Sequence, residues 1–272
     1  MSNISKEKNN RPIGVFDSGV GGLSVLRELK KMLPNEDFVF FADQSHLPYG
    51  EKSKKELVER SLKITNYFIK NYDIKMLILA CNTATSNTIK ELRQRYSFPI
   101  VGTIPAVKVA AEKTKTKNIA VMATIATSKS KALKKLIKDY CFGVNTLNVG
   151  CRGLVDVVEE GELNGKKVGN LLLKYLKIIL KSNVDYLVLG CTHYPFLKKS
   201  IQKIVGNEVE LLDSGKAIAK QTRFLLLKHK IKNKNTSKKG RAIYLTTGNP
   251  LKFSKVSSLL LETKIKAKKI KT

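Results

Sequence analysis

Two cysteines lie in matching local sequences that are far apart in the chain. Cys81 belongs to KMLILACNTAT (75–85) and Cys191 belongs to DYLVLGCTHYP (185–195), at an offset of 110 positions. In each segment an apolar run ends in a small residue, which is followed by the cysteine and then by polar residues. A helix beginning there would point NH groups at the thiol, and such groups stabilise a thiolate. A buried, inert cysteine is the alternative, but the polar neighbours at both positions make a reactive thiol the better interpretation.

Two thiols on opposite sides of one carbon atom suit one particular reaction. One group, as thiolate, removes a proton from one face, and the other, as thiol, delivers a proton to the opposite face. A single base would return the proton to its own face, so inversion at a Cα needs two such groups. Acid–base groups work best with a pKa near the working pH, and cysteine, at roughly 8.5 unperturbed, can be tuned there. The pair therefore indicates stereochemical inversion.

Other polar residues could assist the two thiols. Asp17 and Ser18 open the glycine-rich DSGVGG, which is neither a Walker loop nor GxGxxG. They could contact an ammonium group or orient a thiol, or they could simply cap a helix. His193, two residues after Cys191, could assist proton transfer at that thiol. No local ligand spacing supports a metal site.

Strand and helix patterns alternate along the whole chain, and they place both cysteines at strand ends. A capping box is predicted at the start of one helix, because Ser53 is followed three residues later by Glu56. The alternation predicts an α/β protein with mainly parallel sheets. Strands are predicted at 12–16, 38–42, 76–80, near 100, and at 118–123, 144–149, 186–190, 209–212 and 241–247. Helices are predicted at 22–33, 53–71, 85–95, 128–140, 154–160 and 166–181, and from 195, 214 and 250.

The two halves of this alternation resemble each other. IGVFDSGVGGLS (13–24) is similar to IAVMATIATSKS (119–130) at an offset of 106, close to the offset of the two cysteine segments. Both repeated elements end strands, and open α/β sheets bind ligands at the carboxyl ends of their strands. An internal duplication would therefore supply two such edges, which could enclose a ligand between the two cysteines.

The composition excludes some classes of protein and leaves one alternative open. Four cysteines without a CxxC pair argue against a disulfide scaffold, and reduced thiols fit a cytoplasmic protein. The first ten residues lack the apolar core of a signal peptide, and no apolar run approaches the roughly 20 residues that span a bilayer. The net charge of +29 favours a nucleic-acid partner, but only eight of the 51 basic residues are arginine. Scattered lysines on a solvated surface are the simpler interpretation.

Several motifs together resemble bacterial glutamate racemase. They are DSGVGGLSVL, ADQSHLPYG, ACNTAT, VEEG, LGCTHYPFL and YLTTGNP, and the resemblance extends from about Ile13 to Leu260. It implies two pseudosymmetric three-layer α/β domains with the active site in the cleft between them. The expected domains are 12–106 with 214–262, and 107–213, while 1–11 and 263–272 are expected to be disordered tails. The resemblance also implies racemisation of glutamate without pyridoxal phosphate or any other cofactor, which supplies D-glutamate for peptidoglycan.

The resemblance also implies roles for individual residues. Cys81 and Cys191 would transfer the protons, with support from Asp17 and His193 respectively. Of the pair Glu159 and Glu160, we expect Glu160 to face the site, because adjacent helical residues point about 100° apart. The residues expected to contact the substrate are Asp17, Ser18, Tyr49, Gly50, Asn82, Thr83, Thr85, Thr124, Thr192 and His193.

The chain departs from the family pattern at three positions, and alternative functions remain. Arg152 follows Cys151 where the family usually has proline, Ala123 stands where it usually has glycine, and Asp156 stands where it often has proline. An aspartate racemase would turn over aspartate instead of glutamate. A basic nucleic-acid-binding protein on the same scaffold would bind in a salt-sensitive way without turnover. Members of the family are often homodimers, and the sequence does not indicate a pairing face.

Overall fold

The computed structural model describes residues 9–235 and 237–271, which form two compact units. Unit 1 contains the described residues up to Thr103 and those from Gly215 onward, and unit 2 contains Ile104–Ser214. Each unit is built around one sheet whose strands all run parallel to their neighbours. Among the described residues, no helix combines the length and the apolar character needed to cross a bilayer.

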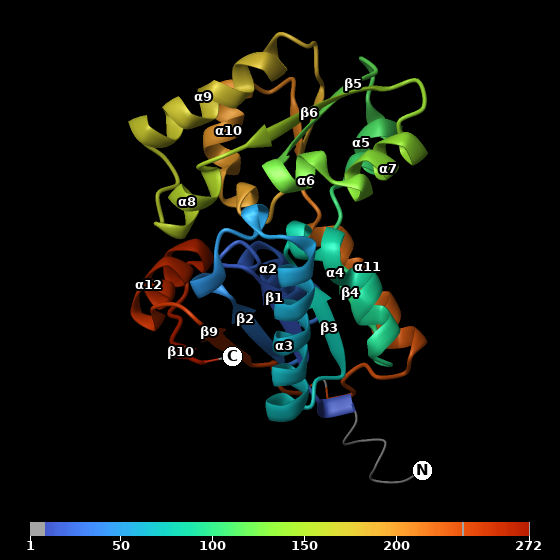
Figure 1. Ribbon diagram of the computed structural model, residues 1–272, viewed down its shortest axis with the longest axis vertical. Helices are drawn as coiled ribbons and strands as arrows, with labels where there is room; N and C mark the ends of the chain where they lie inside the picture. The colour runs from blue at the N-terminus through green and yellow to red at the C-terminus, as the bar shows by residue number, and fades with distance from the viewer. Residues whose placement is uncertain (1–8, 236, 272) are drawn as a thin grey trace. The chain divides into compact units, whose positions relative to one another are not determined.

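The sheet of unit 1 has six strands in the order β10-β9-β2-β1-β3-β4 (Figure 1). Its central strands are continuous apolar runs that are buried on both faces, as is usual when helices cover both sides of a parallel sheet. The strands are β1 (Ile13–Asp17), β2 (Phe38–Ala42), β3 (Met76–Leu79), β4 (Ile100–Gly102), β9 (Ala242–Thr246) and β10 (Ala267–Lys269).

Alternate residues of these strands enter two separate cores. Phe41 contacts Phe68 of a long helix with ring centroids 5.7 Å apart, whereas its neighbour Phe40 stacks on Phe253 at 6.2 Å. Because successive side chains of a strand point to opposite faces, helices must cover both sides of the sheet. The helices are α2 (Leu23–Met32), α3 (Lys54–Tyr72), α4 (Asn82–Arg95), α11 (Gly215–Lys228) and α12 (Pro250–Leu261), with short 3₁₀ turns η1 (Gln44–His46) and η2 (Tyr49–Glu51) after β2.

The sheet of unit 2 has four strands in the order β6-β5-β7-β8. Its strands are β5 (Asn118–Thr124), β6 (Asn145–Cys151), β7 (Tyr186–Leu189) and β8 (Glu210–Leu212). A core of Val107, Ile119, Val121, Leu133 and Val188 joins the sheet to two of its helices. The helices are α5 (Val107–Lys113), α6 (Ile125–Lys129), α7 (Lys131–Tyr140), α8 (Leu154–Glu159), α9 (Lys166–Leu180), η3 (Tyr194–Leu197) and α10 (Lys198–Val205).

The two units share one strand order. The run β2-β1-β3-β4 of unit 1 corresponds to β6-β5-β7-β8 of unit 2. The central strand β1 therefore corresponds to β5 and β3 to β7, at the offsets of 106 and 110 found for the repeated segments. One hydrogen bond recurs at the equivalent place: the NH of Ala80 donates to Phe16 O over 2.8 Å, and the NH of Gly190 donates to Met122 O over 2.7 Å. This correspondence supports an internal duplication and confirms the expected α/β architecture.

Four details of the fold differ from the predicted elements. Helix α5 was not predicted, because it is short and no side chain caps its start. Ser130 divides the helix predicted at 128–140, since it is extended and accepts a cap hydrogen bond from the NH of Leu133. The helix predicted from Pro195 begins as the 3₁₀ turn η3. The segment expected to be a disordered C-terminal tail contains β10, held by main-chain bonds to β9 that need no apolar side chains.

The predicted capping box is present at the start of α3. Ser53 Oγ accepts from the NH of Glu56 over 3.2 Å, and Glu56 Oε2 accepts from the NH of Ser53 over 2.8 Å. The Ser53 hydroxyl also donates to Glu56 Oε2 over 2.7 Å. This bond and the one from the NH of Ser53 lower the pKa of Glu56, so their contribution to stability is present above about pH 4.3 and lost as the pH falls through the lowered pKa.

Replacing Ser53 by alanine should lower the thermal unfolding midpoint by about 2–4 °C at neutral pH, because it removes the cap of a long helix. Ser97, which is exposed in a bend before β4, provides the control. Calorimetry of Ser53→Ala and Ser97→Ala checks this prediction, and equal midpoints for the two variants would contradict it.

Candidate active site

Cys81 lies at the carboxyl end of β3 and is the N-cap residue of α4. Its Sγ accepts a hydrogen bond from the NH of Ala84 over 3.5 Å, and the residue is only 6% exposed. The first NH groups of a helix have no partner within the helix, and they carry partial positive charge. The position therefore stabilises negative charge on this sulfur, as a thiolate base requires.

Asp17 and Ser18 lie beside Cys81 because β1 and β3 are adjacent and in register. Ser18 Oγ is 3.6 Å from Cys81 Sγ and 3.4 Å from Asp17 Oδ1, so the hydroxyl connects the carboxylate with the thiol. Asp17 Oδ1 also accepts from the NH of Gly19 over 2.9 Å. Gly22 permits this arrangement, because a Cβ there would lie 2.5 Å from Asp17 Cβ. Gly22 of DSGVGG therefore serves close packing against the Asp17 carboxylate.

The first turn of α4 presents further polar groups. Asn82 is buried, and its Oδ1 has no hydrogen-bond partner among the described residues. Thr83 is buried next to it. Thr85, which was expected to contact substrate, uses its hydroxyl within the fold: Oγ1 donates to Leu79 O over 3.1 Å and accepts from the NH of Thr103 over 3.1 Å. Asn82 Oδ1 is therefore available to accept a hydrogen bond from a ligand, whereas the hydroxyl of Thr85 is already used within the fold.

Tyr49 and Gly50 belong to η2, in the loop that follows β2. The Tyr49 ring is buried, and its centroid lies 6.1 Å from that of the Phe16 ring. Its hydroxyl donates to Asp43 Oδ2 over 2.7 Å. Burial, the charge of Asp43, the hydrogen bond to Asp43 and the charge of Cys81 raise the pKa of Tyr49 well above its ordinary value. The hydroxyl is therefore protonated, and it donates to Asp43. Polar contact to a ligand from this turn would come from its main chain, where Gly50 is half-buried.

Cys191 follows β7 in unit 2, and its environment differs from that of Cys81. No α-helix begins directly after it, since the chain first forms η3. Instead, the Nδ1 atom of His193 lies 3.7 Å from Cys191 Sγ. The other ring nitrogen, Nε2, lies 2.7 Å from Glu159 Oε1 at the end of α8. Thiol, imidazole and carboxylate thus form a row, in which the carboxylate orients the imidazole toward the sulfur.

The surroundings of His193 determine its charge. Its burial by itself lowers the pKa of His193, but the hydrogen bonds to Cys191 and Glu159 and the negative charges of both raise it. The net result is a pKa well above the usual value of 6.5. The imidazole is therefore protonated at neutral pH, and it can donate to both neighbours. A cation held at this place stabilises negative charge on the Cys191 sulfur.

The carboxylate that reaches His193 is Glu159, not Glu160 as expected. The side chain of Glu159 is 12% exposed, whereas that of Glu160 is 46% exposed and pairs with Lys167 over 3.0 Å. Glu160 is the residue directly after α8, and adjacent helical residues point about 100° apart, so the two carboxylates face different directions. The choice between them depends on how α8 packs, because its buried residues Val157 and Val158 are also adjacent.

The remaining predicted residues of unit 2 lie at the same edge of its sheet. Thr124 ends β5 and caps α6, where its Oγ1 accepts from the NH of Thr127 over 3.2 Å. Thr192 is buried between Cys191 and His193. Cys151 lies next to Thr124 in the register of β5 and β6, and burial raises its pKa to about 12. Cys151 is therefore a neutral thiol at neutral pH.

One of the three departures from the family pattern, Arg152, forms hydrogen bonds through its main chain. The NH of Arg152 donates to Tyr175 Oη over 2.9 Å, and that hydroxyl donates to Arg152 O over the same distance. Proline has no NH and could not form the first of these bonds. Nothing in the structure explains Ala123 or Asp156 in the same way. The described residues contain no group of three or more His, Cys, Asp or Glu side chains that could hold a metal ion.

Asp43 and Arg60, which were not among the predicted site residues, form a buried ion pair close to Tyr49. Arg60 Nη2 is 2.7 Å from Asp43 Oδ1, and the side chains of Arg60 and Asp43 are 9% and 0% exposed. A signal was present in the sequence, because Arg60 falls three residues after Leu57 and four before Ile64 on the apolar face of α3. A charge at such a position requires a buried partner.

Comparison with known proteins agrees with this geometry. Residues 13–222 match the Asp/Glu/Hydantoin racemase family. A glutamate racemase of Herpetosiphon aurantiacus is 42% identical over 251 residues, which are 92% of this chain and 98% of that protein. The crystal structure of glutamate racemase isoform RacE1 from Bacillus anthracis superposes with a TM-score of 0.88 at 30% identity, over 97% of this chain and 98% of that one. A glutamate racemase from Francisella tularensis in complex with D-glutamate gives a TM-score of 0.84 at 31% identity, over 97% and 98%. The chain belongs to the Asp/Glu/Hydantoin racemase family.

Proposed function

We propose that the protein interconverts L- and D-glutamate by proton transfer between Cys81, Cys191 and the substrate Cα, without a cofactor. One observation carries the proposal: equivalent strands of two duplicated units each end in a buried cysteine with its own charge-stabilising partner. A binding protein has no need of two matched thiols. The substrate follows from the relatives, since those with about 40% identity over more than nine-tenths of this chain are named glutamate racemases.

The reaction needs no electron acceptor and no group transfer. The thiolate of one cysteine takes the Cα proton, and the electron pair of the broken C–H bond stays on the substrate, delocalised into its α-carboxylate. The thiol of the other cysteine then donates its proton to the opposite face of Cα. The product has inverted configuration, and the two sulfurs have exchanged their protonation states. The reverse reaction uses the same two steps with the roles of the cysteines interchanged.

The two thiols would depend on different partners. At Cys81, negative charge is favoured by the first turn of α4, while Ser18 and Asp17 hold the thiol in place. At Cys191, the protonated His193 would stabilise the thiolate and Glu159 would keep the imidazole protonated. Each arrangement lets a sulfur carry charge in a buried site, which an isolated thiol could not do.

Polar groups at the carboxyl edges of the two sheets are the proposed contacts to substrate. Asn82 Oδ1, as a buried acceptor without a partner among the described residues, suits the ammonium group of an amino acid. The remaining contacts are proposed at Ser18, Gly50, Thr83, Thr124 and Thr192. The product D-glutamate would serve peptidoglycan synthesis in the cytoplasm, which is the role that the resemblance to bacterial glutamate racemase implies.

Incubation of the purified protein with L-glutamate in D₂O, with no cofactor added, tests the proposal. We expect D-glutamate to form and deuterium to enter at Cα, because each proton donated by a thiol has exchanged with solvent. L-aspartate in a parallel reaction is the control for substrate class, and little turnover is expected. Turnover of aspartate but not of glutamate would favour the aspartate racemase, and the absence of Cα exchange with either would refute racemisation.

A further inference from the structure

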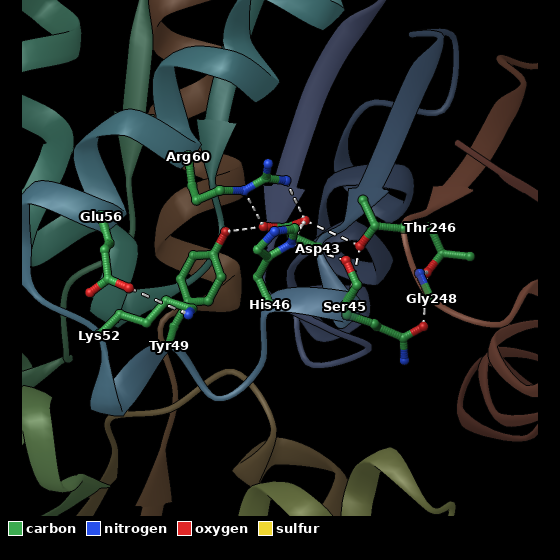
Figure 2. Close-up of polar contacts among 11 residues, drawn as sticks. Asp43, Ser45, His46, Tyr49, Lys52, Glu56, Arg60, Thr246 and Gly248 are labelled. Carbon is green, nitrogen blue, oxygen red and sulfur yellow. Dashed lines mark hydrogen bonds and ion pairs between the residues drawn. The ribbon is translucent and has the colours of Figure 1, made fainter. Parts of the chain in front are cut away.

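A fully buried carboxylate organises the loop that contains Tyr49. Figure 2 shows Arg60 reaching the Asp43 carboxylate from above and the Tyr49 hydroxyl reaching it from the left. Arg60 binds both oxygens of Asp43, through Nε over 3.0 Å and through Nη2 over 2.7 Å. The hydroxyls of Tyr49 and Thr247 also donate to Asp43, over 2.7 and 3.1 Å, and His46 Nδ1 lies 3.0 Å away. Five contacts therefore converge on one carboxylate.

These contacts join three segments that are distant in the sequence. Asp43 and Tyr49 belong to the loop 43–51 after β2, Arg60 belongs to α3, and Thr247 follows β9. Thr247 Oγ1 accepts from the NH of Ser45 over 3.0 Å, which adds a second link between the loop and β9. The loop contains only two short 3₁₀ turns, so it has little regular structure of its own to define its conformation. The contacts to the Asp43 carboxylate therefore hold the loop in its conformation.

The same carboxylate is close to the proposed site. The NH of Asp43 donates to Asp17 O over 3.0 Å, and Asp17 connects through Ser18 to the Cys81 sulfur. The Tyr49 ring lies in one apolar cluster with Phe16 and Cys81. A change in the position of loop 43–51 would therefore move Tyr49 and Gly50 relative to the thiol.

We infer that Asp43 and Arg60 are positioning residues that set substrate affinity by holding loop 43–51 beside Cys81. This inference rests on the proposed racemase function. A loop that is already ordered pays no ordering entropy when substrate binds. Loss of the pair would weaken binding of substrate and transition state alike, which raises KM and leaves kcat nearly unchanged. A direct role in proton transfer would instead lower kcat.

Asp43→Asn is the first test, and a second buried ion pair supplies its control. Lys75 Nζ lies 2.6 Å from Glu36 Oε2, and these side chains are 0% and 2% exposed. Glu36 precedes β2 and Asp43 follows it, so the two pairs lie at opposite ends of one strand, roughly 20 Å apart at 3.3 Å per residue. Glu36→Gln and Asp43→Asn each remove one buried carboxylate, so both should lower the thermal midpoint, because each removes the negative charge next to a buried cation.

The two variants should differ in kinetics. We expect Asp43→Asn to raise KM for both enantiomers about tenfold, with kcat within about threefold of the parent protein, whereas Glu36→Gln leaves both constants unchanged. An unchanged KM in Asp43→Asn, or an equal rise in Glu36→Gln, would overturn the inference. A loss of kcat at unchanged KM would also overturn it.

Thr247→Val decides the question if Asp43→Asn does not fold. Valine keeps the shape of threonine but removes the hydroxyl that joins Asp43 to the NH of Ser45. A raised KM with little change in kcat is again expected, and an unchanged KM would overturn the inference. Failure of the parent protein to racemise glutamate is a different result, because it refutes the proposed function before any variant is made.

Discussion

Cys191→Ala is expected to abolish glutamate racemisation, with a loss of more than about 10³-fold in turnover, and Cys81→Ala should do the same. Each variant retains one acid–base group, which can act on one face of Cα only. General acid–base groups contribute roughly 10²–10⁴-fold each. Polarimetry or a chiral assay with both enantiomers measures the loss in each direction.

Cys151→Ala is the matched control for the two thiol variants. It removes a buried thiol from the same edge of the sheet of unit 2, but from a cysteine whose pKa is raised to about 12 by burial. That thiol carries no charge at neutral pH, so this variant should retain racemase activity. Unimpaired racemisation by Cys191→Ala would remove that residue from the mechanism, and a loss in Cys151→Ala as large as in Cys191→Ala would remove the distinction between the two thiols.

Glu159→Gln is expected to lower kcat by roughly 10²-fold, at the lower end of the range for acid–base catalysis. Glutamine keeps the length of the side chain and can still accept from His193 Nε2. It removes one of the two negative charges, those of Cys191 and Glu159, that raise the pKa of the imidazole. The variant should therefore lower the pKa of His193 and weaken the stabilisation of negative charge on Cys191. KM should change less than kcat, because the charge acts on the sulfur that is proposed to transfer the proton.

The pH dependence gives an independent readout of the same change. The raised pKa of His193 means that activity depending on its protonated form is lost as the pH rises through that raised value. Glu159→Gln should move this alkaline limb to lower pH. The imidazolium also stabilises the folded state, fully below the unfolded pKa of about 6.5 and progressively less as the pH rises through the folded pKa. The chain has only three histidines, so NMR titration can follow His193 directly.

Glu160→Gln is the control, since it removes a neighbouring carboxylate that is 46% exposed and paired with Lys167. Its kcat and its pH profile should match those of the parent protein. A larger loss in Glu160→Gln than in Glu159→Gln would restore the original expectation from the sequence. An unchanged alkaline limb in Glu159→Gln would show that this carboxylate does not control the charge of His193.

Much of the fold could be predicted because local patterns and core packing agree. The apolar run Phe38–Ala42 was predicted with its observed bounds, and Ser53 marks the start of α3 through its own side chain. Elements without a local signal were missed. Strand β10 consists of Ala267, Lys268 and Lys269, and it exists because main-chain groups of β9 are available as partners. Helix α5 lacks a side-chain cap and contains seven residues.

The candidate site could be predicted in part, since its residues lie at strand ends that the sequence makes visible. Cys81, Asp17 and Ser18 come together because β1 and β3 are neighbours, which the duplication and the α/β pattern made plausible. Thr85 could not be assigned from its position alone. Its hydroxyl serves the main chain of β3 and of the residue after β4, and only their packing shows this.

The chemical groups, their repetition and the strand ends that carry them follow from the amino-acid sequence alone, because residue type and local periodicity are properties of the chain. The partner of each group depends on the tertiary structure. Glu159 rather than Glu160 reaches His193 because the packing of α8 selects one of two adjacent directions. Asp43 meets Arg60 and Thr247 because three distant segments converge, and the cost of burying a charge requires that they pair there. Contacts of this kind depend on long-range packing, which no local pattern encodes.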